Sequence, residues 1–159
     1  MLKQFLAAFP KIQLPVTLTP DLIHVFSQNN DPLPLSLAEG FLLPLLGEAA
    51  DEFTEFIPSF SLPDTEGFHA VVVWKASLMH YSYILITLDN NGALIDRVVL
   101  SGTFVDQNTL IQSVATIEED WDIVVMSGKA SGEAVYDATS SKMTTMELLP
   151  DGKLIIYHS

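Results

Sequence analysis

Histidine side chains are the first candidates for metal binding or acid–base chemistry in this chain. They are His24, His69, His80 and His158. None lies three or four residues from another, so the helical pair of metal ligands is absent. His69 and His80 flank neighbouring predicted strands, where a hairpin would bring them together, and Glu66 or Asp64 could then complete a metal site. The alternative is that both histidines are strand-end residues half in solvent.

The densest acidic cluster is Glu118, Glu119, Asp120, Trp121 and Asp122. Calcium takes roughly six to eight oxygen ligands from a defined loop, and this stretch lacks the spacing and glycine of an EF-hand. One interpretation is a polar turn between strands with Trp121 packed at the rim. The other is a weak contact with Ca²⁺ or with a basic peptide.

Nucleophilic and phosphate-binding motifs are missing from the sequence. It has no Gly-x-Ser-x-Gly elbow, which serine hydrolases of the α/β type need. Residues 127–132 contain glycine and serine but lack phosphate-loop spacing and precede a strand-like run, so we predict a loose hairpin loop there. The absence of cysteine excludes disulfides and cysteine-based zinc sites. No cofactor is predicted.

Aromatic residues are the remaining candidates for a binding surface. Trp74, Tyr81, Tyr83, Trp121 and Tyr136 all fall on predicted strands. Aromatic side chains on the concave face of a sheet can line an apolar pocket. The alternative is that they are ordinary core residues.

Strand patterns dominate the chain after about residue 59. Runs rich in β-branched and apolar residues lie there between turn signals, the clearest of which are Asp89-Asn90-Asn91-Gly92 and Pro150-Asp151-Gly152. The turns are too short for parallel crossovers, so we predict an antiparallel meander. The predicted strands are 68–76, 81–88, 94–100, 109–118, 121–127, one or two within 134–149, and 154–157.

Helical patterns precede the strands. Residues 2–9 have apolar positions at helical spacing. Thr19 is a candidate cap for a second helix that starts at Pro20, and Ser36-Leu37-Ala38-Glu39 reads as a capping box for a third helix, which Pro44 kinks or ends. We predict a further helix over 49–56 and an extended edge segment near 12–18.

These elements predict an α+β fold in one domain, 1–159. The segment 1–58 would be mainly helical and 59–159 mainly antiparallel sheet. The short N-terminal helices would pack on the C-terminal sheet, because they are the available cover for its apolar face. We expect a curved, half-barrel-like meander.

Three stretches carry a resemblance to known sequences. They are FPKIQLP at 9–15, YILITLDNNGALID at 83–96 and LPDGKLI at 149–155. In these stretches the chain resembles a loose group of small uncharacterised bacterial proteins, many from Bacteroidetes. Members of such groups are often exported lipoproteins, but this chain lacks the leader and the lipobox cysteine. The resemblance implies no activity and no functional residues.

Charge and hydropathy narrow the function classes. The net charge is −13, and no basic stripe could neutralise phosphates, which argues against nucleic acids and anionic membranes as partners. No signal peptide or membrane span is visible, so a cytoplasmic location is expected. We therefore expect a non-enzymatic acidic domain that binds a basic protein partner, as an inhibitor or immunity-type protein would do. A carrier of small apolar ligands and an enzyme of unidentified class are the alternatives, and a dimer through an edge strand is possible in each case.

Overall fold

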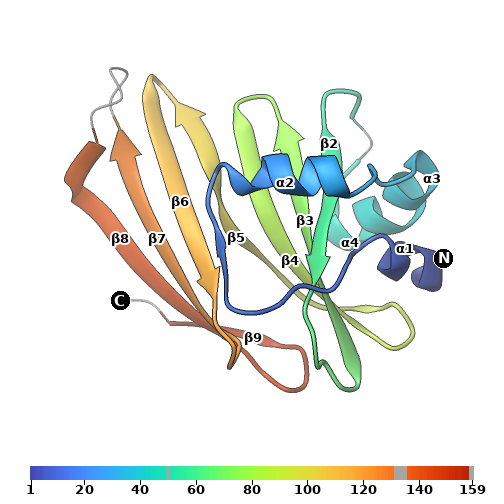
Figure 1. Cartoon of the computed structure of the whole chain (residues 1–159). Coiled ribbons are helices and arrows are strands. Elements are labelled where there is room, and N and C mark those ends of the chain that lie inside the picture. The colour runs from blue at the N-terminus through green and yellow to red at the C-terminus, as the bar shows by residue number, and fades with distance from the viewer. Residues whose placement is uncertain (50, 131–135, 158–159) are drawn as a thin grey trace.

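The computed structural model describes residues 1–49, 51–130 and 136–157 (Figure 1). The strands are β1 Val16–Leu18, β2 Glu55–Ser61, β3 Phe68–Ser77, β4 His80–Asp89, β5 Leu94–Asp106, β6 Thr109–Ile117, β7 Asp122–Ala130, β8 Tyr136–Leu148 and β9 Leu154–Tyr157. The helices are α1 Leu2–Ala7, α2 Leu22–Asn29, α3 Leu35–Leu37, the π-helical segment η1 Ala38–Leu42 and α4 Leu43–Leu46. No helix in these described ranges is long and apolar enough to cross a membrane.

The strands form one open, nine-stranded sheet. Strands β2 to β9 follow one another in chain order, and each neighbouring pair is antiparallel. The predicted antiparallel α+β class is therefore confirmed. The predicted turn at 89–92 forms as expected: the Asp89 carboxylate accepts hydrogen bonds from the backbone N–H groups of Asn91 (2.8 Å) and Ala93 (2.9 Å), and Gly92 has a φ of +86°.

Strands β5 and β6 separate part of the way along their length. Residues 103–106 of β5 pair with 109–112 of β6, whereas the rest of β5 pairs with β4 alone. Beyond the separation, β1 takes the place beside β6, with Leu18 opposite Ala115. The sheet is therefore divided at this point, and β1 lies next to the division.

Strands β3 and β4 carry apolar side chains on both faces. Residues 82–88 of β4 are all buried, the pattern expected of a strand that is covered on two sides. On one face, Val73 and Ile86 cluster with Phe5 of α1 and Leu42 of η1. The clustered residues of the other face include Val72, Leu85, Phe26 of α2, Leu18 of β1 and Ile123 of β7.

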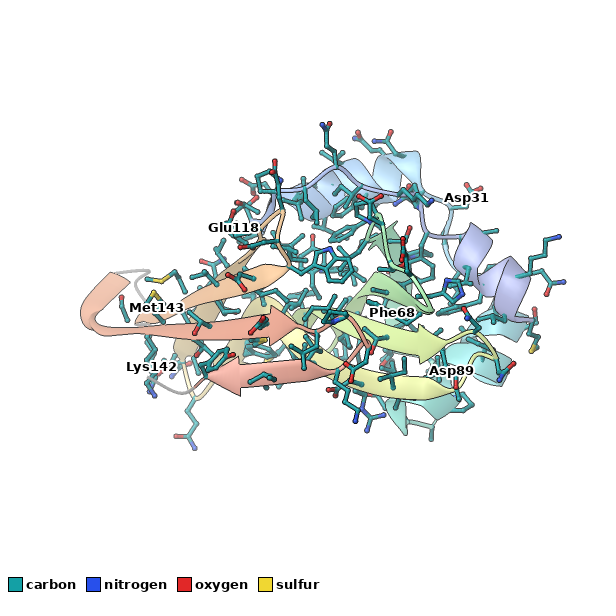
Figure 2. The ribbon with its side chains drawn as sticks, turned by 90° about the horizontal axis from the view of Figure 1, so that it is seen from below. Asp31, Phe68, Asp89, Glu118, Lys142 and Met143 are labelled. Atoms are coloured by element: carbon teal, nitrogen blue, oxygen red, sulfur yellow. The ribbon has the colours of Figure 1, made fainter. Side chains whose placement is uncertain are left out.

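Helix α2 crosses in front of β3 and β4 in Figure 1, and the short helices α1, α3 and α4 gather at the β2 end of the sheet. Figure 2 shows Phe68 among the side chains in the interior, where it is 2% exposed. Glu118 lies at the periphery of the same view. The interior of the molecule is therefore apolar and the turn after β6 lies at its margin.

The helix predicted over 49–56 is wrong, and the mainly helical segment ends earlier than residue 58. Residues 55–61 form β2, the first strand of the sheet. Pro58 lies within β2, because an end strand tolerates proline, and here the register shifts between Pro58 and Phe60. The side-chain amide of Asn30 donates to the carbonyl groups of Pro58 and Ser59, both at 2.9 Å.

The predicted helix caps also differ from the structure. Helix α2 begins two residues later than expected, with Asp21 as N-cap and no side-chain capping bond. The capping box of Ser36 and Glu39 does not form, since α3 begins after Pro34 without a side-chain cap and passes directly into η1. Pro44 lies in the first turn of α4, where its missing N–H is tolerated.

Two C-terminal predictions fall near the limits of the described chain. The loop predicted at 127–132 is wrong for residues 127–130, which belong to β7; residues 131 and 132 lie outside the described residues. The segment 134–149 contains the single strand β8 rather than two.

Candidate functional site

The predicted metal pair of histidines does not form. His69 is paired with Leu88 and His80 with Ser77, which places the two histidines at opposite ends of the β3–β4 hairpin. Eight residues of strand separate these positions, roughly 25 Å at the usual rise per residue. Within the described residues, no group of three or more histidine, aspartate or glutamate side chains is placed to hold a metal ion. His80 instead contacts the ring of Phe104, with 5.3 Å between ring centroids.

The acidic cluster at 118–122 lies in the turn between β6 and β7. The backbone N–H of Glu118 donates to the carbonyl of Asp122 at 2.8 Å, and the backbone N–H of Asp122 donates to the Asp120 carboxylate at 3.1 Å. Trp121 has a φ of +70°, and its ring packs edge-on against Phe68 at 5.7 Å. Glu118, Glu119 and Asp120 are exposed. The arrangement is a polar turn anchored by one aromatic side chain.

Electrostatic repulsion is concentrated at the last residue of this turn. The Asp120 carboxylate raises the pKa of Asp122, and desolvation and the charge of Glu147 on the paired strand β8 raise it further. The Tyr157 hydroxyl donates a hydrogen bond to Glu147 at 2.8 Å. This margin of the sheet therefore carries acidic groups that repel one another.

Three of the five aromatic candidates come together. Trp74 and Tyr81 stack with their ring planes 9° apart and their centroids at 5.8 Å. Tyr83 is directly opposite Trp74 in the β3–β4 register. Trp121 belongs to the separate contact with Phe68, and the side chain of Tyr136 lies outside the described residues.

The pocket that these aromatic residues share has a floor of two cross-strand rows. In the first row, Trp74 of β3, Tyr83 of β4 and Ser101 of β5 are register partners. In the second row, Tyr81 of β4 is opposite Thr103 of β5. Directly opposed residues in antiparallel strands project from the same face of the sheet, with Cβ atoms roughly 5 Å apart. All five side chains therefore face the same space.

The roof of the pocket comes from the N-terminal half of the chain. Leu18 at the end of β1, Pro20, and Ile23 and His24 in α2 line it from above. Ser113 of β6 forms a side wall. The pocket volume is about 340 Å³, at the lower end of the sizes usual for small-molecule sites. We call this space the β5–β6 pocket, because it lies where these two strands separate.

Glycine is required at the point of separation. The backbone N–H of Gly102 donates to the Ser113 hydroxyl at 2.9 Å, which links β5 to β6 through a side chain. A Cβ atom at Gly102 would lie 2.0 Å from the carbonyl oxygen of Tyr81. Any side chain at Gly102 would therefore force β4 and β5 apart under the pocket.

Two hydroxyl groups of the pocket residues lack hydrogen-bond partners. Within the described part of the chain, Tyr83 Oη and Ser101 Oγ each expose less than 1 Å² and have no partner. Burial raises the pKa of the Tyr83 hydroxyl, which therefore stays protonated at physiological pH. Buried polar groups are nearly always satisfied, so two adjacent exceptions in one pocket require an explanation.

The pocket has an open and a closed end. Tyr81 is 45% exposed, whereas Tyr83 is 4% and Ser101 2% exposed. His24 is exposed at the rim. A molecule entering past Tyr81 would therefore meet aromatic surface first and the buried hydroxyls last.

Sequence reasoning identified the aromatic residues but missed the β5 and β6 contributors. Ser101, Gly102 and Thr103 lie beyond residue 100, where the strand was predicted to end. The polar run Ser-Gly-Thr resembles a strand end, although the apolar pair Phe104 and Val105 after it was a signal that the strand continues. Ser113 had no distinguishing sequence signal.

Comparisons with protein-family models, with curated proteins and with solved structures found no match to this chain. The resemblance to small bacterial proteins therefore stays a prediction.

Proposed function

We propose that the chain binds a small, largely apolar molecule in the β5–β6 pocket. The observation that carries the proposal is the pocket itself: about 340 Å³ lined mainly by apolar and aromatic surface. Trp74 and Tyr81 provide a stacked aromatic wall, and Leu18 and Ile23 provide an aliphatic roof. A few polar groups among apolar walls are typical of ligand sites.

The fold that we infer for this role is a curved half-barrel with helices packed on it. The sheet would curve around the pocket, with α2 as its cover. Helices α1, α3 and α4, which share a buried cluster with β3 and β4, would brace the opposite face. The division between β5 and β6 supports this inference, because it opens space that a regular sheet would fill with a strand.

Binding is favoured over catalysis by the composition of the lining. Among the described residues, no carboxylate lines the pocket, and His24, at the rim, is the one imidazole that does. General acid–base chemistry usually needs a positioned partner for such a group. An enzyme of unidentified class is accordingly the weaker alternative.

The test is titration with N-phenyl-1-naphthylamine, an uncharged probe whose fluorescence rises in apolar surroundings. We expect saturable, single-site binding that quenches Trp74. A Thr103→Tyr substitution should reduce the affinity about tenfold or more, because the larger ring would occupy the pocket. Thr103→Val, which keeps the size of the side chain, should retain binding.

The tryptophan signal has its own control. Trp121 lies against Phe68, outside the pocket lining, so Trp121→Phe should leave the quenching intact. Unsaturable fluorescence with the wild-type chain, or equal affinity in Thr103→Tyr, would contradict the proposal.

A second candidate function is binding of a basic protein partner by an acidic interaction domain, as an inhibitor or immunity-type protein would do. The net charge of −13 and the repulsion that raises the pKa of Asp122 favour it. Association with such a partner should weaken as salt rises. A stoichiometric complex whose affinity is unchanged by salt and by Glu119→Gln/Asp122→Asn would contradict it. Dimerisation through an edge strand, at residues 154–157 or 12–18, also stays a prediction.

A further inference from the structure

We propose that the ligand of the β5–β6 pocket is uncharged and carries an oxygen that the hydroxyls of Tyr83 and Ser101 hold by hydrogen bonds. This inference rests on the proposed function and specifies the chemical class of its ligand. Tyr83 of β4 and Ser101 of β5 are direct partners in the register of these two strands. Their side chains therefore leave the same face of the sheet at adjacent positions.

The contrast with Ser113 shows why these two hydroxyls are distinctive. The Ser113 hydroxyl accepts from the N–H of Gly102 at 2.9 Å and lies 3.4 Å from the carbonyl of the same residue. The backbone of Gly102 therefore already satisfies the Ser113 hydroxyl. The hydroxyls of Tyr83 and Ser101 have no protein partner in the described chain, so their hydrogen-bonding capacity is open to a ligand.

Access requires a small movement at the closed end of the pocket. Both oxygens expose less than 1 Å². A serine hydroxyl changes direction by rotation about one bond between staggered positions, and both O–H groups rotate to suit an acceptor. A ligand oxygen at the closed end of the pocket could then accept from Tyr83 and either accept from or donate to Ser101.

The charge of the surroundings selects an uncharged group. No lysine or arginine of the described chain lines the pocket, and the net charge is −13. Burial raises the pKa of Tyr83 and keeps its hydroxyl neutral. A carboxylate at the closed end would lose its hydration without gaining a cation, which is unfavourable. Burial of an uncharged carbonyl or hydroxyl oxygen loses less hydration free energy than burial of a carboxylate.

The test compares three probes of similar shape with the wild-type chain at neutral pH: naphthalene, 1-naphthol and 1-naphthoate. Isothermal titration calorimetry gives the affinity of each. We expect 1-naphthol to bind about tenfold more tightly than naphthalene, the effect of one or two added hydrogen bonds. 1-Naphthoate should bind most weakly of the three.

The variants Tyr83→Phe and Ser101→Ala remove one hydroxyl each. Each should reduce the preference for 1-naphthol over naphthalene, and the double variant should abolish it. Tyr157→Phe is the matched control, because its hydroxyl is bound to Glu147 at the sheet margin. It should keep the full preference.

The outcomes separate this inference from the proposed function. Equal affinity for naphthalene and 1-naphthol overturns the inference and leaves apolar binding standing. A preference that survives in the double variant, or tightest binding of 1-naphthoate, also overturns it. Failure of all three probes, together with N-phenyl-1-naphthylamine, overturns both.

Discussion

The Tyr83 hydroxyl has a free-energy consequence for the unliganded protein. A buried polar group without a partner costs roughly 1–3 kcal/mol, while the ring of Tyr83 keeps its edge contact with Phe26 at 6.2 Å. We therefore expect Tyr83→Phe to raise the free energy of unfolding by about 1 kcal/mol, or the melting temperature by about 2–4 °C. Thermal unfolding followed by circular dichroism measures it. A clear loss of stability would show that a bound water or another group satisfies the hydroxyl.

The matched substitution Tyr157→Phe separates the effect of burial from that of the hydroxyl itself. Tyr157 is exposed, and its hydroxyl donates to Glu147. Loss of the Tyr157 hydroxyl should leave the free energy of unfolding unchanged or slightly lower. A gain of the same size in both variants would mean that loss of any hydroxyl stabilises this sheet.

The raised pKa of Asp122 gives a prediction with a definite sign. Because Asp120 and Glu147 raise the pKa in the folded state, the folded protein binds this proton more tightly than the unfolded chain does. The stabilisation is present at acid pH and is lost as pH rises through the folded pKa. Asp122→Asn should therefore raise the melting temperature at neutral pH and flatten its dependence on pH in the acid range.

Asp31→Asn is the control for Asp122→Asn, because it removes the same charge from an exposed position outside this turn. It should change stability less. Equal effects of the two substitutions would assign the gain to net charge and not to the repulsion with Asp120.

Residue chemistry was predictable where it depends on local composition. The aromatic residues Trp74, Tyr81 and Tyr83 could be proposed as pocket walls, because their strands and periodicity are visible in the sequence. The pairing of Tyr83 with Ser101 could not, since it depends on a register shift between Tyr83 and Ile84. The predicted metal pair of His69 and His80 was wrong for a related reason. The hairpin turn lies beside His80 and far from His69, so the register keeps the two histidines apart.

At the scale of elements, the division between β5 and β6 depends on Gly102. A Cβ atom there would meet the Tyr81 carbonyl at 2.0 Å, and backbone cannot yield as a flexible side chain can. We expect Gly102→Ala to lower the free energy of unfolding by about 2–3 kcal/mol, in the range of overpacked cores. Denaturant unfolding measures it, and N-phenyl-1-naphthylamine binding should weaken as well.

Gly67 provides the comparison for Gly102. It has a φ of +79° but open space around a Cβ atom. Gly67→Ala should therefore lower the free energy of unfolding only by the backbone strain of an alanine at positive φ, about 1–2 kcal/mol, and should keep probe binding. A larger loss at Gly67 than at Gly102 would contradict the close-contact argument.

Strands and helices could be predicted where the pattern of apolar residues and a recognisable turn motif indicate the same element, and not elsewhere. The β3–β4–β5 succession follows from runs rich in β-branched and apolar residues and from the Asp89 turn. β2 was missed because Pro58 and two phenylalanines at short spacing mimic the end of a helix, and an edge position is visible only in the assembled sheet. The end of β5 was placed early because Ser101 and Gly102 read as a strand end.

The whole molecule combines a heavily apolar interior with a strongly acidic exterior. The chain has 20 acidic and seven basic residues. One salt bridge, between Lys75 and Glu48, is present among the described residues. Most of the acidic groups are therefore hydrated charges that repel one another, and this repulsion opposes the compact state.

Stability should consequently rise with ionic strength. Added salt shortens the screening length from about 30 Å at 0.01 M to about 10 Å at 0.1 M, which weakens repulsion across a molecule of this size. We expect the melting temperature to increase by several degrees between roughly 0.01 and 0.5 M sodium chloride, with most of the gain at the low end. The increment should be smaller in Asp122→Asn, because one repulsive contact is already gone. Sucrose at matched osmolality should not reproduce the steep initial rise, since it does not screen charge; a melting temperature that falls with sodium chloride would show that attractive ion pairs outweigh the repulsion among the acidic groups.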